Sequence, residues 1–406
     1  MANTLITPSI IAKEGLRLLK NNLVMGRLVH TDYAKEFNKV GSTISVRKPV
    51  KFNVTSGATR TNQDVTEGTV PVAIDQQKHV SWNFTSNELT LTVDQYSERY
   101  IKPAVAAIAQ SVESSLMGLY SSVPMWVGTA GTTPSSFLEI GAARQKLIEH
   151  AVPMGEKLNA VLNPAAALKV ANDLKTLYTQ EKTLTALEQV RIGRYAGFDT
   201  YEGQSIPLHT VGPLGGTPVV NGASQTSNST PQANSMSLIT NGWTAAAASR
   251  LKAGDVITIT GVNDVNPMTY ADLGYKKQFV VLSDVSSDGS GNATLTISPA
   301  IVTTGPYQNV TAGPANSAAI QVVTGTASTA YAQNLCFHKN AFALVWSPLE
   351  MPDGAPFKAM ESDPDSGMSI RVVKQYDIDN DKDIIRLDVL YGVKTIYPEL
   401  ACRLTG

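Results

Sequence analysis

Two runs of alternating apolar residues near the N-terminus constrain the fold most strongly. The larger apolar residues in them sit at even positions: Ile44, Val46, Val50, Phe52 and Val54, then Val70, Val72, Ile74, Val80, Trp82 and Phe84. Alternation with period two is typical of strands that have one apolar face. Because a polar segment at 55–69 separates the runs, the pattern predicts a long two-stranded hairpin. An isolated hairpin is marginal in water and exposes two edges. We therefore expect its apolar face to dock on another element, with a second subunit as the natural candidate.

The segment before this hairpin is basic. Residues 1–51 carry nine Lys or Arg and only three acidic residues. Apolar residues between Ile10 and Leu23 recur at helical spacing, and Pro8 is a plausible helix start, so one or two short amphipathic helices are expected here. Such an arm suits an acidic partner or nucleic acid, although a merely solvated helix face explains it equally well. The candidate contact residues are Lys13, Arg17 and Lys20.

A longer helix is predicted after the hairpin, between Ser86 and about Tyr120. Apolar residues spaced by three or four form one stripe: Tyr96, Tyr100, Ala104, Ile108, Val112, Leu116 and Leu119. Pro103 should begin or kink this helix, because proline is poorly tolerated inside one. The stripe indicates core packing.

Residues 135–210 read as compact α/β or α+β structure. Ser136 and Glu139 form a capping-box pattern before a helix. A short strand is expected at 157–162. Asn163 and Pro164 then supply an N-cap residue followed by proline at the first helical position.

The composition changes sharply near Val211. Only nine charged residues occur in 211–334, with no Glu and no His, whereas 17% of the whole chain is charged. Strand-like pieces alternate there with Gly, Asn, Ser and Pro turns, and 215–237 is expected to be a nearly uncharged loop. The predicted strands are Val256–Thr260, Phe279–Leu282, Ala293–Ile297 and Ala319–Val323. Mixed composition then returns, with strands expected at Leu335–Val345, Ile370–Val373 and Ile384–Val393. The simplest interpretation is an all-β module inserted into an α+β host.

Little in the sequence indicates catalysis or a cofactor. The net charge is −1, which argues against a strongly basic nucleic-acid binder. There is no Gly-Lys dipeptide for a Walker A loop, and the five histidines are scattered singly, so we expect structural histidines. The two cysteines, Cys336 and Cys402, are too few for a disulfide framework or a metal cage and are expected to be buried thiols. No apolar run is long enough to span a bilayer, and the N-terminus lacks the pattern of a secretory signal.

The acidic run at 377–383 is the sequence pattern that most resembles a metal-binding or catalytic site. Asp377, Asp379 and Asp381 match the first ligand positions of a calcium loop, but Lys382 replaces the glycine and Asp388 the final glutamate. A solvated hairpin turn is the better interpretation. Weak cation binding between neighbouring chains, and a carbohydrate-active enzyme using these carboxylates, stay open as alternatives.

Several local patterns, in order along nearly the whole chain, resemble one known family. They are Arg194–Asp199 followed by Ile206–Thr210, Leu251–Val262, Asn334–Leu344, Leu390–Val393 with Pro398 and Glu399, and the Asn163–Pro164 pair. Together they resemble the major capsid (coat) protein of tailed bacteriophages with the Hong Kong 97-type fold. The likeness is greater to the branch of short-tailed Salmonella-type phages, whose coat protein carries an inserted β-barrel domain.

The resemblance implies an α+β capsid fold with a defined domain order. The expected parts are an N-terminal arm (1–40), an extended β-hairpin loop (41–88), a spine helix and peripheral domain (89–135), the first part of an axial domain (136–210), the inserted all-β domain (211–334), the second part of the axial domain (335–376) and C-terminal peripheral-domain strands (377–406).

The resemblance also implies that the extended loop lies across a neighbouring subunit. The candidate contact residues there are Arg47, Lys48, Lys51, Phe52, Glu67, Asp75, Lys78 and Trp82. The expected function is structural: pentamers and hexamers of this non-enzymatic, cofactor-free subunit form an icosahedral virion shell, assembled in the bacterial cytoplasm. The expected partners are other copies of the chain, a scaffolding protein and a portal protein. The shell is expected to enclose double-stranded DNA without binding a specific DNA sequence. No membrane partner is expected. The remaining alternative is a secreted or surface-layer β-rich adhesin.

Two departures from the family pattern limit what carries over. The insert of relatives can bear a charged loop that makes contacts across two-fold axes, whereas the candidate here, Asn221–Ser237, has no charge. Hydrogen bonds, or a shortened loop, are therefore expected there in place of salt bridges. Covalent cross-linking is not predicted, because nothing identifies the Lys, Asn and Glu that it requires. No long propeptide precedes the arm, which favours a separate scaffolding protein over a fused one.

Overall fold

The computed structural model describes residues 8–33, 43–54, 56–58, 60, 62, 67–85, 97–153, 155–174, 192–355 and 357–406. These residues belong to two compact units through which the chain passes repeatedly. Unit 1 comprises Met1–Val46, Pro71–Met117 and Phe342–Ile396, and unit 2 comprises Arg47–Val70, Gly118–Ala341 and Tyr397–Gly406.

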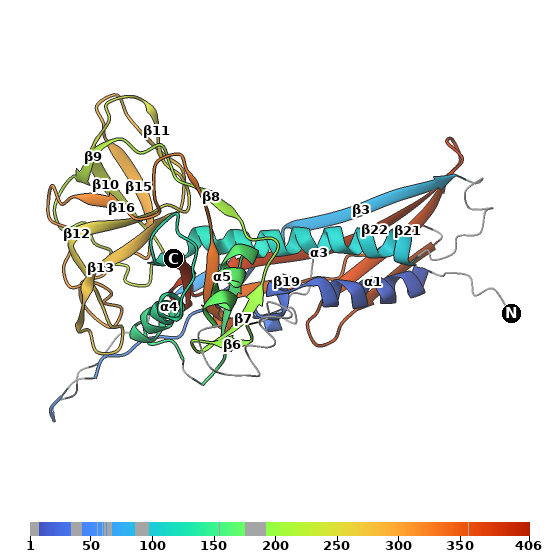
Figure 1. Cartoon of the computed structure of the whole chain (residues 1–406), viewed down its shortest axis with the longest axis horizontal. Coiled ribbons are helices and arrows are strands. Elements are labelled where there is room, and N and C mark those ends of the chain that lie inside the picture. The colour runs from blue at the N-terminus through green and yellow to red at the C-terminus, as the bar shows by residue number, and fades with distance from the viewer. Residues whose placement is uncertain are drawn as a thin grey trace. The chain divides into compact units, whose positions relative to one another are not determined.

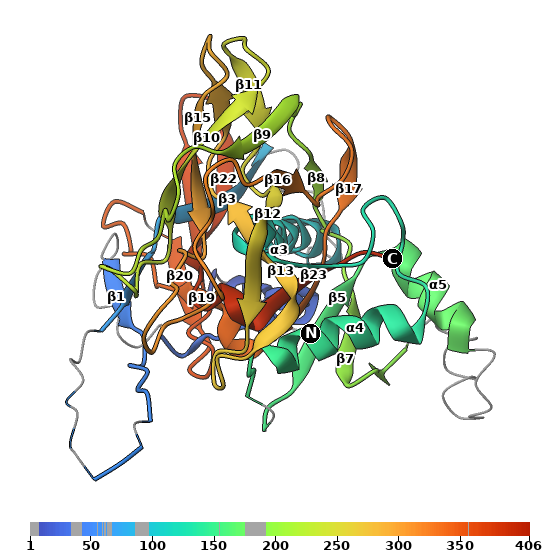
Figure 2. The ribbon, with the colours of Figure 1, turned by 90° about the vertical axis from the view of Figure 1, so that its left-hand side faces the viewer.

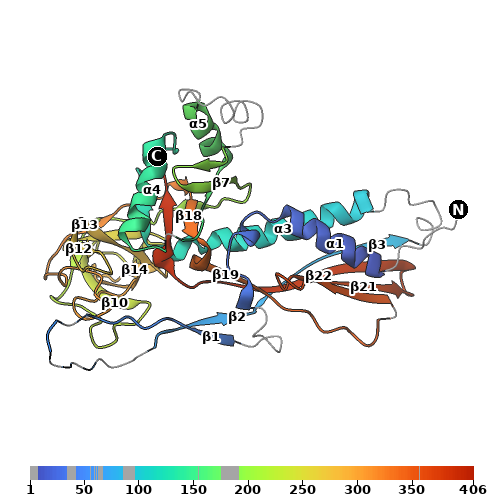
Figure 3. The same cartoon turned by 90° about the horizontal axis from the view of Figure 1, so that it is seen from below.

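Unit 1 is a sheet covered by two helices. The helices are α1 (Pro8–Asn22) and α3 (Lys102–Met117), and the strands are β3 (Gln76–Thr85), β19 (Phe342–Trp346), β20 (Phe357–Ser362), β21 (Ser369–Asp377) and β22 (Lys382–Thr395). The strand order is β19-β22-β21-β20, and β3 pairs with β22. Helices α1 and α3 lie side by side along this sheet (Figures 1 and 3). Short turns of helix occur at Met25–Arg27 and Ser97–Ile101.

The core of unit 1 follows from the helical stripe. Ala104, Ile108, Val112 and Leu116 are all buried in α3. Pro103 lies in the first turn of that helix, where its missing N–H is not needed. Tyr96 lies outside the described residues. The stripe predicted from the sequence is thus core packing at these four positions, whereas Tyr100 is exposed and Leu119 is half-buried.

Unit 2 contains the β-module, defined here as strands β9 to β16. They are β9 (Gly216–Val220), β10 (Met236–Trp243), β11 (Ala248–Leu251), β12 (Val256–Val265), β13 (Asp272–Val281), β14 (Val285–Ser287), β15 (Ala293–Ser298) and β16 (Ile320–Val322). Six of them form one sheet in the order β16-β12-β13-β15-β10-β9. The two edge strands approach each other, because Val219 bridges to Ala319. The sheet therefore curls around a core that includes Leu238, Trp243 and Phe279.

The rest of unit 2 is a second sheet with two helices. Its strands, in sheet order, are β4 (Met125–Val127), β23 (Ala401–Leu404), β18 (Asn334–His338), β5 (Leu158–Leu162), β7 (Phe198–Glu202) and β6 (Arg194–Tyr195). Apolar residues of α4 (Phe137–Glu149) and α5 (Pro164–Leu174) share its core. The capping box is present at Ser136 and Glu139, and the Asn163 side chain accepts the Ala166 N–H at 2.8 Å, so both predicted helix starts are confirmed.

A short pair of strands connects this sheet with the β-module. Strand β8 (Leu208–Thr210) leads into the module, β17 (Ala330–Ala332) leads out of it, and the two pair with Thr210 opposite Ala330 (Figure 2). We call β8 and β17 the neck. The chain therefore enters and leaves the module at neighbouring points.

Several sequence expectations need correction. The second alternating run does not form one arm of a long hairpin. It breaks near Asp75 into β2 (Thr69–Ala73), which pairs with β1 (Thr43–Arg47), and β3, which pairs with β22. Val50, Phe52 and Val54 lie in no strand. Alternation of apolar and polar residues indicates a half-buried strand, but it does not determine which strand pairs with it.

Two further expectations fail for local reasons. The strand predicted at 335–345 is two strands, because Lys339–Ala341 forms a helical turn that sends β18 and β19 into different sheets. The uncharged segment 215–237, expected to be a loop, contains the short strand β9. Within the described residues, no helix is long and apolar enough to cross a membrane.

Candidate assembly surfaces

The extended loop is paired at its base. The Lys48 backbone N–H donates to the Gly68 carbonyl at 2.7 Å, and Arg47 Nη1 lies 3.1 Å from Glu67 Oε2. The ion pair is exposed on both sides, so it adds little to stability. Residues 47 and 67 are thus brought together, as a hairpin base requires. Residues 55, 59, 61 and 63–66 of the predicted tip lie outside the described residues.

Beyond this base, one arm of the loop contacts the β-module of the same chain. Lys48 Nζ donates to Asn234 Oδ1 at 2.8 Å and lies 5.5 Å from the ring centroid of Tyr397. Burial lowers the pKa of Lys48. The Lys51 N–H donates to the Tyr307 hydroxyl at 3.1 Å.

Two apolar side chains of this arm are open to solvent. Phe52 is 61% exposed and Val54 is 98% exposed. Phe52 lies between Lys51 and Asn53, which both form hydrogen bonds with the module, and Val54 follows directly. The loop therefore presents apolar surface at its point of attachment. Large apolar groups exposed close together are typical of an interaction surface.

The other candidate contact residues lie in unit 1, along or next to β3. Asp75 and Lys78 are exposed, and Trp82 is half-buried opposite Ile385 of β22. The indole N–H of Trp82 is buried without a hydrogen-bond partner among the described residues. Strand β3 pairs with β22, and no other described strand pairs with its second edge.

The basic residues predicted for the arm lie together on α1. Lys13, Arg17 and Lys20 are all exposed, while Ile11 and Leu19 are buried. Arg17 pairs with Glu14 at 2.7 Å, and Lys20 Nζ lies 3.0 Å from Asp363 Oδ2. The helix therefore presents a basic, solvent-facing stripe that is partly neutralised by neighbouring carboxylates.

The acidic run forms the turn between β21 and β22. Asp377 accepts the Asp379 N–H and the Asn380 side-chain amide, and the Tyr376 hydroxyl donates to Asp381. These contacts stabilise a solvent-exposed hairpin turn, as predicted. Within the described part of the chain, no group of three or more His, Cys, Asp or Glu is placed to hold a metal ion.

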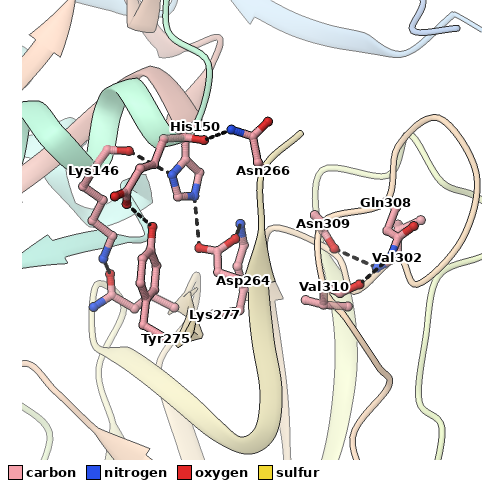
Figure 4. A network of polar contacts seen from close by, with 12 residues as sticks. Lys146, His150, Asp264, Asn266, Tyr275, Lys277, Val302, Gln308, Asn309 and Val310 are labelled. Carbon is pink, nitrogen blue, oxygen red and sulfur yellow. Dashed lines mark hydrogen bonds and ion pairs between the residues drawn. The ribbon is translucent and has the colours of Figure 1, made fainter. Parts of the chain in front are cut away.

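A buried ionic network joins helix α4 to the β-module (Figure 4). His150 Nε2 lies 3.0 Å from Asp264 Oδ2, and Lys277 Nζ lies 2.8 Å from Asp264 Oδ1. The other ring nitrogen of His150 faces the Lys146 carbonyl at 3.0 Å. Both ring nitrogens of His150 therefore face oxygens that can accept a hydrogen bond. Next to it, the Tyr275 hydroxyl donates to Glu149 at 2.9 Å.

A second buried pair lies at the neck. His209 of β8 places Nε2 2.8 Å from Asp255 Oδ1, which also accepts from the Thr324 hydroxyl at 3.1 Å. Asp255 immediately precedes β12, and Asp264 lies near the end of the same strand. Both ends of β12 are therefore held by histidines that lie outside the module.

A sequence model of the P22 coat protein family, described as gene protein 5, matches residues 1–406. The chain belongs to this family of phage coat proteins. Among curated proteins, none matches the chain.

Solved phage capsid structures are similar to this coat protein over most of its length. One from Mycobacterium phage Che8 is 13% identical, with a TM-score of 0.49, and covers 94% of this chain and 90% of that one. The mature capsid of bacteriophage PhiM1 is 12% identical, with a TM-score of 0.41 and coverage of 90% and 82%. The CUS-3 coat protein I-domain is 33% identical over 30% of this chain and all (100%) of its own, with a TM-score of 0.18.

The family membership makes this chain a structural protein, the major capsid protein of a bacteriophage, located in the virion shell. Its α+β architecture with an all-β module is the Hong Kong 97-type capsid fold expected from the sequence.

The coat protein also contains contact residues that the sequence did not reveal. Tyr270, Tyr307 and Asn234 contact the extended loop from the β-module, and nothing in their local sequence links them to residues 48–53. Asp255 and Asp264 gave a weak signal, because each is a rare charge within or beside a predicted strand. A charge at such a position calls for a buried partner.

Proposed function

We propose that this coat protein assembles into pentamers and hexamers that tile an icosahedral shell around double-stranded DNA. The observation that carries the proposal is the extended loop, which presents Phe52 and Val54 to solvent at the end of a braced arm. A side chain such as Phe52 gains free energy when a partner covers it, at about 25 cal/mol per Å² of apolar area buried. A neighbouring copy of the coat protein is the proposed partner.

Weak single contacts suffice for such a shell. A contact of millimolar strength corresponds to about −4 kcal/mol, and many contacts made together raise the effective concentration of each. Weak contacts also let misplaced subunits leave. The near-neutral chain, with a net charge of −1, suits a wall that encloses DNA without gripping it, because tight nonspecific binding needs many phosphate contacts.

We further propose a separate scaffolding protein as the assembly partner, with a portal protein in the same shell and the host cytoplasm as the place of assembly. The basic stripe of α1 is the proposed scaffolding contact. Its three cations are exposed, and an acidic segment of a partner would complement them.

Expression alone and together with the scaffolding protein, followed by electron microscopy, tests this proposal. Closed shells of uniform size support it. A coat protein that stays monomeric in the presence of its scaffolding partner contradicts it.

Deletion of residues 56–68 tests the loop separately. The deletion variant should remain a folded monomer and form no regular shells. Normal assembly of this variant would show that the loop is not the contact between subunits.

A further inference from the structure

The β-module contacts both arms of the extended loop within one subunit. On the outgoing arm, Lys51 donates to Tyr307 at 3.1 Å and Asn53 accepts from the Tyr270 hydroxyl at 2.6 Å. On the returning arm, the Asn234 amide donates to the Thr69 carbonyl at 3.4 Å. Asn234 also accepts from Lys48 on the first arm, so this single side chain connects the two arms.

The contact residues also bond to the rest of the module. The Tyr307 hydroxyl accepts from Gln232 Nε2 at 3.0 Å, and the Tyr270 hydroxyl lies 3.3 Å from the Pro306 carbonyl. The Asn234 carbonyl accepts from the Ser298 hydroxyl at 2.8 Å. The two tyrosine hydroxyls and the Asn234 backbone therefore also have partners within the module, whereas the Asn234 side chain bonds to the loop. We call Asn234, Tyr270 and Tyr307 the platform.

The attachment is polar and loosely packed. A cavity of about 290 Å³ lies between the loop and the module, lined on one side by Lys48, Pro49, Lys51 and Gly68 and on the other by residues that include Gln232 and Tyr307. Individual hydrogen bonds therefore attach the loop to the module across an open pocket. These bonds set the direction of the loop, although its side chains are not packed into the core of the module.

We propose that the platform is a positioning device for assembly: the β-module holds the extended loop of its own subunit in the direction from which Phe52 and Val54 reach a neighbour. This inference rests on the proposed function, because it assigns the module a role in the contact between subunits. Asn234, Tyr270 and Tyr307 act as positioning residues through the loop.

A hydroxyl-deletion variant tests the platform. Tyr270→Phe combined with Tyr307→Phe removes both hydroxyls and keeps both rings, so the module should retain its fold. Tyr331→Phe is the matched control, because the Tyr331 hydroxyl also accepts a backbone N–H, that of Thr326 at 3.2 Å, and Tyr331 belongs to β17 of the neck. Asn234→Ala provides an independent variant that removes the link between the two arms.

The first measurement is hydrogen exchange of the unassembled full-length subunit, followed by mass spectrometry of peptides covering 47–54. Loss of one hydrogen bond changes such an equilibrium by about 2- to 12-fold. We expect exchange in this peptide to be faster by about 2-fold or more in the double variant and in Asn234→Ala. In Tyr331→Phe it should be unchanged. Unchanged exchange in both platform variants, with strands β12 and β13 still protected, would overturn the proposal.

The second measurement is the rate of shell formation with the scaffolding protein, followed by light scattering. Both platform variants should assemble several-fold more slowly than the wild type and Tyr331→Phe. A looser loop together with a normal assembly rate would also overturn the positioning role. Failure of the wild type to assemble would contradict the proposed function, while hydrogen exchange would still decide whether the module braces the loop.

Discussion

His150 Nε2 and Asp264 Oδ2 lie 3.0 Å apart, and both side chains are almost completely buried. The pair joins the C-terminal end of α4 to β12, and Lys277 completes it from β13. Burial alone would raise the pKa of Asp264, but Lys277 and His150 together lower it below its usual value. The Asp264 carboxylate is thus stabilised in its charged form inside the protein, chiefly by the Lys277 ammonium.

Asp264→Asn should strongly destabilise unit 2. The substitution leaves the buried Lys277 ammonium without a countercharge, and breaking a buried ion pair in this way typically costs about 3–5 kcal/mol. Chemical denaturation followed by tryptophan fluorescence measures the loss. Asp272→Asn is the control, because Asp272 is exposed on the same hairpin and pairs only with local groups. An equal effect of the two substitutions would contradict the prediction.

The same carboxylate predicts an acid limb in the stability profile. A carboxyl group whose folded pKa is lowered contributes stability above its unfolded pKa, about 3.9 for Asp, and this contribution is lost as pH falls through the folded value. Unfolding free energy should therefore decline below about pH 4. In Asp264→Asn this part of the decline should be absent. An identical acid limb in wild type and variant would show that Asp264 does not contribute.

Glu113 should be required for the turn that follows α1. This buried carboxylate accepts the N–H groups of Met25 and Gly26 at 3.0 and 3.1 Å. Glu113→Ala leaves both donors unpaired, and each buried unpaired group costs about 1–3 kcal/mol. Glu113→Gln keeps one acceptor oxygen and should cost less. Hydrogen exchange at residues 23–28 and thermal melting measure the two variants, and equal behaviour of Ala and Gln would contradict the prediction.

The two cysteines should resist alkylation in the folded protein. Cys336 and Cys402 lie opposite each other in β18 and β23, and both are fully buried. Burial raises the pKa of both thiols, that of Cys402 to about 11. Since the thiolate is the reactive form, iodoacetamide at pH 8 should label neither residue until denaturant is added. Rapid labelling under native conditions, detected by mass spectrometry, would show that the pairing between β18 and β23 opens.

Charge reversal on α1 should weaken binding of the scaffolding protein. Lys13→Glu, Arg17→Glu and Lys20→Glu invert the exposed stripe, and rim charges act mainly on association rate and salt dependence. Binding measured by surface plasmon resonance should be slower and less sensitive to salt. A control with Lys157→Glu, Lys169→Glu and Arg194→Glu inverts three exposed cations elsewhere and should bind normally. Equal losses in both variants would indicate a general charge effect.

Exposed apolar groups of the loop should matter for assembly and not for folding. Phe52→Ser with Val54→Ser removes apolar surface that makes few contacts within the subunit, so the melting temperature should change little. Shell formation should slow at least ten-fold. Ile239→Ser, a change at a half-exposed position of β10, is the comparison and should assemble normally.

Local signals in the sequence predicted local structure well. The capping box at Ser136 and the Asn163–Pro164 pair each fix a helix start within a few residues, so short-range chemistry determines them. Pairing between distant strands is different. Strand β3 carries a clear alternating pattern, but its partner β22 lies about 300 residues away, and the pattern is satisfied by any strand that buries one face.

The candidate contact residues also divide into those that local sequence predicts and those that depend on distant segments. The exposed positions of Lys13, Arg17 and Lys20 follow from helical spacing, because these three fall on the face opposite Ile11 and Leu19. The platform could not be predicted in this way. Tyr307 lies in an irregular segment, and only the folded module brings its hydroxyl to the backbone of Lys51, 256 positions earlier.

The neck makes the β-module an exchangeable part. Thr210 and Ala330 are direct partners in β8 and β17, so a turn of a few residues could close the chain there while β18 and β7 keep their places in the host sheet. A lineage could therefore acquire, enlarge or lose such a module by a single recombination event at one site. His150 and His209 would restrain such an exchange. Each forms a hydrogen bond with an aspartate in or next to β12, so a host without the module would keep two histidines that have lost these partners.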